Sequence, residues 1–153
     1  MNGSLRIGLA GLGTVGIDVA GRLLNGAVPG ATLAAVCARN KALDRGLDLS
    51  AARWVDHPVD LASAGDVDLV VELIGGTGEP ASSLIEAALA AGKSVVTANK
   101  ALLAERAMQL AVVSEASGAS LAYEAAVAGG IPVIKTLREA LAGNKISRVS
   151  GIL

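Results

Sequence analysis

The sequence of 153 residues is poor in aromatic, cysteine and histidine residues. Trp54 and Tyr123 are its only aromatic side chains, so the hydrophobic core must be built from aliphatic residues. The single Cys37 excludes an internal disulfide bond and is typical of a reducing compartment. With only one histidine, His57, the chain has no His/Cys group with the spacing of a zinc site.

Two further absences narrow the class of partner. The net charge is -1 and the pI is about 5.8, so the excess of lysine and arginine that nucleic acids and anionic membranes require is missing. No apolar run reaches the ~20 residues of a membrane-spanning helix, and residues 1–10 lack the pattern of a signal peptide. We therefore expect a cytoplasmic protein that acts on small molecules, with residues 1–153 in one domain.

Apolar segments typical of strands alternate along the chain with segments of helical periodicity. Strands are predicted over residues 5–10, 31–38, 67–76, 94–99 and 119–126, with the start of another over 145–153, and helices over 15–24, 79–93, 100–117 and 132–141. Residues 39–65 are polar and rich in turn formers, which predicts a loop with short helical pieces. The alternation predicts an α/β fold with a mostly parallel sheet flanked by helices, and the Val/Leu/Ile run over 67–76 its central strand.

A glycine-rich turn lies between the first predicted strand and the first predicted helix. Its G-x-G-x-x-G pattern is typical of the Rossmann-type, doubly wound fold that binds dinucleotides. In that setting Gly11 permits the tight turn, Gly13 lets the backbone approach a pyrophosphate, and Gly16 allows close packing of the helix. The predicted cofactor contacts here are Gly11, Leu12, Gly13, Thr14, Val15 and Gly16. The alternative is a tight turn that holds nothing.

The end of the second predicted strand bears on the choice of cofactor. A fold that selects NAD usually carries an acidic residue there, which binds the ribose 2′-hydroxyl. This sequence instead has Arg39, with Lys41 close by, and a guanidinium group can bind a 2′-phosphate through paired hydrogen bonds. The pattern favours NADP over NAD, with NAD still possible. The alternative interpretation makes Arg39 an ordinary solvated charge.

Ligands of parallel α/β sheets bind beyond the carboxyl ends of the strands, which nominates three more segments. They are Gly75, Gly76 and Thr77 after the central strand, Asn99 and Lys100 after the next, and residues 124–131 after the one that follows. Lys100 is the strongest candidate, although a lysine at a helix start is as often only solvent-exposed. Glu72, inside the apolar central strand, is predicted to be a hydrogen-bonded structural group rather than a catalytic acid.

Four longer strings carry a resemblance to a known family. They are GLGTVG, VVELIGG, GKSVVTANKALLA and YEAAVAGGIPVIKTLREALAGNKISRVSGIL, and together they resemble the amino-terminal half of homoserine dehydrogenase over essentially the whole chain. The resemblance implies the cofactor-binding domain of an enzyme that interconverts aspartate 4-semialdehyde and homoserine with NADPH or NADH, on the route to threonine, isoleucine and methionine.

The resemblance also implies roles for particular residues. Lys100 of the TANK string would lie at the nicotinamide and the substrate as a catalytic residue. A monovalent cation, usually sodium in the family, would be bound largely through backbone oxygens. Its ligands would be Glu124, Val127, Gly129 and Ile131. Family members continue past the GIL string into a substrate and dimerisation domain, so we expect these 153 residues to be part of a longer protein and inactive alone.

Two rival functions and one expectation about assembly remain from the sequence. The chain could belong to a dehydrogenase of a related amino-acid semialdehyde, or it could be a nucleotide-binding module without chemistry. An apolar run at its end, over residues 145–153, would leave apolar surface bare if the domain stopped there, which favours a homo-oligomer.

Overall fold

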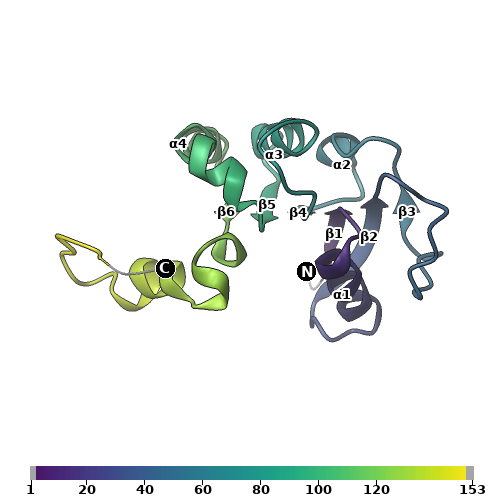
Figure 1. Ribbon diagram of the computed structural model, residues 1–153, viewed down its shortest axis with the longest axis horizontal. Helices are drawn as coiled ribbons and strands as arrows, with labels where there is room; N and C mark the ends of the chain where they lie inside the picture. The colour runs from purple at the N-terminus through teal and green to yellow at the C-terminus, as the bar shows by residue number, and fades with distance from the viewer. Residues whose placement is uncertain (1–2, 151–153) are drawn as a thin grey trace.

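The computed structural model describes residues 3–150 and contains a six-stranded, all-parallel sheet between two layers of helices (Figure 1). The strands lie in the order β3-β2-β1-β4-β5-β6. Their bounds are β1 Leu5–Ala10, β2 Ala31–Cys37, β3 Arg53–Trp54, β4 Leu69–Glu72, β5 Ser94–Thr97 and β6 Leu121–Ala122. Because the strand order reverses between β1 and β4, the chain winds outward in both directions from that point. The predicted doubly wound α/β fold is confirmed.

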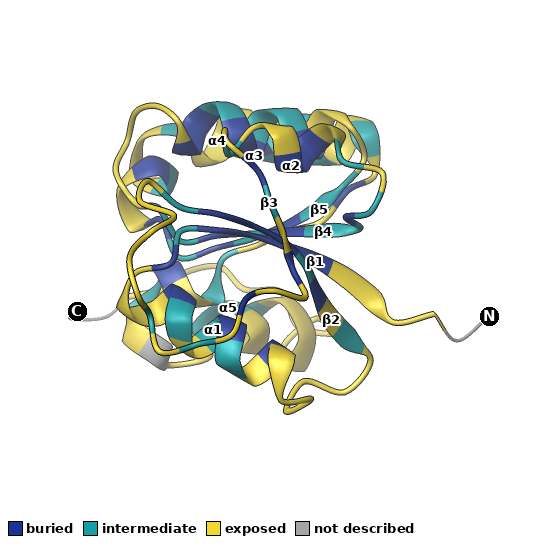
Figure 2. Ribbon diagram, turned by 90° about the vertical axis from the view of Figure 1, so that its right-hand side faces the viewer, coloured by how far each residue is buried: buried dark blue, intermediate teal, exposed yellow. Residues whose placement is uncertain are grey.

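Helices cover both faces of the sheet (Figure 2). One layer holds α2 (Asp60–Ser63), α3 (Ala81–Ala90) and α4 (Lys100–Ser117), and the other holds α1 (Thr14–Leu24) and α5 (Val133–Lys135). Short turns surround α5, namely η1 (Glu124–Ala126), η2 (Ala128–Gly130) and the π-helical η3 (Thr136–Ala140). Among residues 3–150, no helix is both long and apolar enough to cross a bilayer.

The alternation of side chains along β1 divides the core between the two faces. Ile7 and Leu9 pack on the α1 side, whereas Ala10 faces the layer of α2, α3 and α4. Aliphatic side chains fill both cores, as the scarcity of aromatic residues requires. Fully burying one leucine or isoleucine contributes about 1.5–3 kcal/mol, so these two layers dominate the stability of the sheet. Figure 2 shows the resulting line of buried residues along the central strands.

The structure differs from the sequence prediction in the middle of the chain. The predicted loop over 39–65 contains a strand, β3, that pairs with β2 through Ala35 and Val36. Two residues are too few to produce a periodic pattern, so the sequence carries no signal for this strand. The central strand β4 is confirmed between β1 and β5, but it is shorter than the predicted range of 67–76.

The last two predicted strands are also corrected. β6 ends at Ala122 rather than at residue 126, because its one neighbour, β5, pairs with it only through Val95 and Val96. Residues 145–150 form no strand, and the remainder of that prediction, 151–153, lies outside the described residues. Ile146 and Val149 of this segment are exposed. A strand without a neighbour leaves its backbone N–H and C=O groups unpaired, so the apolar pattern alone did not produce one.

Candidate functional site

The three glycines of the turn after β1 occupy three different environments. Gly11 has φ +98°, and a Cβ there would lie 2.6 Å from the carbonyl oxygen of Leu73, so only glycine fits. A Cβ on Gly16 would lie 2.0 Å from the carbonyl oxygen of Gly11, which places the first turn of α1 directly against this loop. Gly13 is different, because nothing lies within 4 Å of its Cβ position. The turn is therefore tightly packed on both sides of one open position.

The open position lies at the N-terminus of α1. Gly13 is the N-cap of this helix, no side chain caps it, and its first turn contains no acidic residue. The first intrahelical bond runs from the Ile17 N–H to the Gly13 carbonyl, so the N–H groups of the first turn point out of the helix end. Thr14 and Val15 of this turn are exposed. Free N–H groups and the positive end of the helix dipole together favour a bound anion such as a phosphate.

The segments after β4 and β5 lie beside this turn. Gly75 and Gly76 both have positive φ, and the space at their Cβ positions is open. Thr77 follows them on the surface. The Asn99 side chain donates a hydrogen bond to the Gly76 carbonyl at 2.8 Å, and it caps α4 by accepting from the Leu102 N–H at 3.1 Å. Lys100, the first residue of α4, is exposed next to this cap. The structure thus brings together the predicted residues of these two segments.

Arg39 lies just beyond the end of β2, on the other side of the glycine turn. β2 is joined to this turn by the bond from the Gly11 N–H to the Cys37 carbonyl, at 2.8 Å. Arg39 is exposed and forms no hydrogen bond or ion pair with any residue of the range 3–150. Lys41, in contrast, pairs with Asp56 at 2.5 Å and holds the pKa of that carboxyl below its usual range. Of the two basic residues singled out in the sequence, Arg39 is the one left available to a ligand.

The structure adds Arg45, which the sequence prediction missed. Its guanidinium group donates to the carbonyl oxygens of Leu12 (3.3 Å) and Asn40 (2.6 Å) and lies over the Trp54 ring, 5.8 Å from the centroid. Arg45 thereby ties the loop that carries Arg39 to the glycine turn. No local pattern could identify this role, since Arg45 and Leu12 are 33 positions apart in an unassigned polar stretch.

The predicted cation ligands follow β6, the last strand in the sheet, at the edge formed by the carboxyl ends of the strands. Ala128 and Gly129 both have positive φ, so the backbone folds back on itself between Val127 and Ile131. The Glu124 carboxylate is not directed to this turn. It accepts from the N–H groups of Ile134 and Lys135 at 3.2 and 3.0 Å, at the start of α5. The one carboxylate of the segment therefore stabilises a helix end, and only backbone carbonyl oxygens of residues 124–131 remain as candidate ligands for a hard cation.

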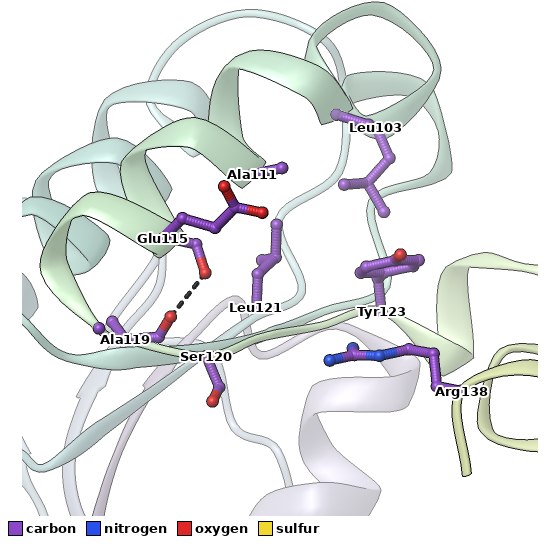
Figure 3. Close-up of a pocket in the computed structure, with 11 residues that line it drawn as sticks. Leu103, Ala111, Glu115, Ala119, Ser120, Leu121, Tyr123 and Arg138 are labelled. Atoms are coloured by element: carbon purple, nitrogen blue, oxygen red, sulfur yellow. Dashed lines mark hydrogen bonds between the residues drawn. The ribbon is translucent and has the colours of Figure 1, made fainter. Parts of the chain in front are cut away.

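A separate hollow lies between α4 and β6 (Figure 3). Tyr123 lies there between Leu103 and Arg138, and the Ser114 hydroxyl donates to the Ala119 carbonyl at 2.5 Å. None of the predicted cofactor residues lines this hollow. The candidate cofactor site therefore lies at the carboxyl ends of β1, β2, β4 and β5, and not in this hollow.

Comparisons with known proteins identify the family of the chain. The family model described as homoserine dehydrogenase, NAD binding domain, matches residues 11–124. The homoserine dehydrogenase of Neisseria gonorrhoeae is 42% identical over 156 residues, covering 97% of this chain and 35% of that protein. That of Bacillus subtilis is 34% identical and covers 98% of this chain and 36% of that protein.

Solved structures of homoserine dehydrogenases are similar to this chain as well. A homoserine dehydrogenase from Thiobacillus denitrificans superimposes with a TM-score of 0.81 and 39% identity, over 92% of this chain and 34% of that one. The enzyme of Staphylococcus aureus at pH 8.5 gives a TM-score of 0.69 and 30% identity, over 82% of this chain and 33% of that one. The chain thus spans about a third of the length of the relatives that it matches.

Proposed function

This chain belongs to the homoserine dehydrogenase family and contains its NAD-binding domain, and on that premise we propose that residues 1–153 form one unit that binds NADP(H). The observation that carries the proposal is the open Gly13 position at the uncapped start of α1, between two tightly packed glycines. A backbone with no Cβ and with outward N–H groups fits a pyrophosphate, which must approach within hydrogen-bond distance.

Each neighbouring segment receives one part of the coenzyme in this proposal. The N–H groups of the turn from Leu12 to Gly16 bind the pyrophosphate, and the free guanidinium of Arg39 binds the 2′-phosphate. On the other side of the turn, Gly75, Gly76 and Thr77 accommodate the nicotinamide half. NAD would leave Arg39 without a phosphate partner, and this difference supports the choice of NADP.

Lys100 is the proposed catalytic residue. When bound, the coenzyme would supply a hydride to the carbonyl carbon of aspartate 4-semialdehyde in the direction that yields homoserine. Negative charge then develops on the carbonyl oxygen, and a lysine ammonium group stabilises that charge and supplies a proton. The Asn99 cap fixes the backbone of Lys100 at the start of α4, and the bond from Asn99 to the Gly76 carbonyl holds this exposed lysine at the same edge of the sheet as Gly76.

We further propose a monovalent cation, sodium by analogy with the family, at residues 124–131. The backbone oxygens of Glu124, Val127, Gly129 and Ile131 are its proposed ligands. The donor set suits a hard cation, and the two successive positive φ values at Ala128 and Gly129 support the proposal because they fold the ligand segment back on itself. Exposed apolar side chains at Ile146 and Val149 support a homo-oligomer as the state of the whole protein.

Calorimetric titration with NADPH and NADH tests the cofactor proposal. Arg39→Asp should weaken NADPH binding roughly 10- to 100-fold, the range expected for charge-assisted hydrogen bonds of about 1.5–3 kcal/mol. NADH binding should change by no more than about twofold, because it lacks the 2′-phosphate. Arg148→Asp makes the same change of charge at an exposed position outside the proposed site and serves as the control. Equal losses for the two coenzymes would remove the assignment of Arg39.

The reaction itself is tested by following NADPH absorbance as the full-length protein that contains this chain is mixed with aspartate 4-semialdehyde. Oxidation of NADPH with this substrate, and not with other amino-acid semialdehydes, supports homoserine dehydrogenase activity. Faster turnover of another semialdehyde would transfer the proposal to that substrate. Coenzyme binding without turnover of any semialdehyde would leave a nucleotide-binding module.

A further inference from the structure

A fully buried carboxylate lies between the loop after β4, proposed to receive the nicotinamide half, and the start of α4, which carries Lys100. Glu72, the last residue of β4, is 0% exposed. One of its oxygens, Oε1, accepts hydrogen bonds from the N–H groups of Ile74 (2.7 Å) and Gly75 (3.0 Å), and the other, Oε2, accepts from the Thr97 hydroxyl at 2.5 Å. The prediction that Glu72 is a hydrogen-bonded group is confirmed. A buried carboxylate is costly unless its oxygens are paired in this way.

The bonds continue from Thr97 into a closed ring. The Thr97 hydroxyl oxygen accepts from the Asn99 N–H at 2.9 Å, and the Asn99 side chain donates to the Gly76 carbonyl at 2.8 Å. The ring thus leaves the β4 loop at Glu72, crosses to β5, and returns to the β4 loop at Gly76. It includes the Asn99 cap of α4, so the backbone of Lys100 is fixed relative to Gly75 and Gly76.

The direction of these bonds requires that both side-chain oxygen atoms of residue 72 accept hydrogen bonds. The Thr97 hydroxyl donates its one proton to Glu72, and its oxygen accepts from the Asn99 N–H. Glutamine has the same shape but only one acceptor oxygen. Its NH₂ group would face either the Thr97 hydroxyl, whose proton would then lose its acceptor, or the two backbone N–H groups, which would lose theirs. If Glu72 only filled space, its replacement by glutamine would have no effect.

We infer that Glu72 is a positioning residue that holds the β4 loop and the start of α4 as one rigid pair around the nicotinamide half of the coenzyme. This inference rests on the proposed cofactor function. The adenosine half lies beyond the influence of the ring, because Arg39 follows β2, on the opposite side of β1 from Glu72. Opening the ring therefore affects the two halves of the coenzyme unequally.

Calorimetry on the Glu72→Gln variant tests the inference with two probes, NADPH and 2′,5′-ADP, which lacks the nicotinamide half. We expect the Kd for NADPH to rise roughly tenfold, as for the loss of one or two hydrogen bonds, and the Kd for 2′,5′-ADP to stay within about twofold. Glu105→Gln, an exposed change on α4, should leave both constants unchanged. Equal losses for the two probes, or no loss for either, would overturn the inference.

A pair of variants at Thr97 covers the case in which Glu72→Gln does not fold. Thr97→Ser keeps the hydroxyl group and should retain wild-type affinity for NADPH, whereas Thr97→Val removes it and should reproduce the selective loss. Equal NADPH affinities in the serine and valine variants would contradict the inference. If the unmodified protein binds neither probe, the cofactor proposal fails instead, so the two failures are distinguishable.

Discussion

Gly13 offers the sharpest perturbation of the proposed cofactor site, because its environment predicts an effect on binding without an effect on folding. Its φ of -81° and ψ of -162° are accessible to any residue, and a Cβ would meet nothing within 4 Å. In Gly13→Ala the new methyl group would occupy the open space that we assign to the pyrophosphate.

The expected change in the free energy of unfolding is small. Alanine is a poorer N-cap than glycine, but it also restricts the unfolded chain, which offsets that loss by about 0.4–1 kcal/mol. The net change should lie within about 1 kcal/mol, measured as the midpoint of urea unfolding. The effect of Gly13→Ala on NADPH binding should be larger. Loss of one or two N–H bonds to a phosphate, at about 1.5–3 kcal/mol each, raises the Kd for NADPH by at least roughly tenfold.

Gly16→Ala is the matched control, since the same substitution three residues later meets a filled space. Its Cβ would lie 2.0 Å from the Gly11 carbonyl oxygen, so the backbone must shift and the unfolding midpoint should fall. Wild-type NADPH affinity in a folded Gly13→Ala protein would refute the reasoning, because it would show that the open space is not where the coenzyme binds.

Two further predictions concern chemistry and pH. In the full-length protein, Lys100→Ala should lower the rate of NADPH oxidation with aspartate 4-semialdehyde by roughly 10²- to 10⁴-fold, the usual contribution of a general acid. An unchanged rate would show that Lys100 is only an exposed surface residue. The Arg6 guanidinium lowers the pKa of Asp68 from 3.8 to about 2. The ion pair therefore stabilises the folded protein at pH values above the pKa of Asp68 in the unfolded chain, and this stabilisation is lost as the pH falls toward 2. In Asp68→Asn, the unfolding midpoint should therefore fall less steeply over that window than in the wild type, and parallel curves would contradict the assignment.

The parts of the fold that were predictable from the sequence are those whose signals are local. Helix α4 has the predicted bounds of 100–117, because Asn99 caps its first turn and Gly118, with φ +73°, ends it. In contrast, β3 and the end of β6 depend on how far a neighbouring strand extends. A single sequence does not contain that information in any one segment.

The same distinction applies to the candidate site. The glycine turn was predictable because the spacing of Gly11, Gly13 and Gly16 is itself the structural requirement. The bonds of Arg45 to Leu12 and of Glu72 to Thr97 join residues 33 and 25 positions apart, and no periodicity marks them. Glu72 could be recognised as a polar group that needs partners, but its partners appear only in the folded chain.

The stacking of Arg45 on Trp54 gives the protein an internal optical probe. Trp54 is the single indole of the chain, and the cation above it is bonded to the main chain of Leu12. A displacement of that main chain moves a charge next to the fluorophore and alters its emission. We therefore expect binding of the coenzyme at the start of α1 to change the tryptophan fluorescence, which needs no added dye.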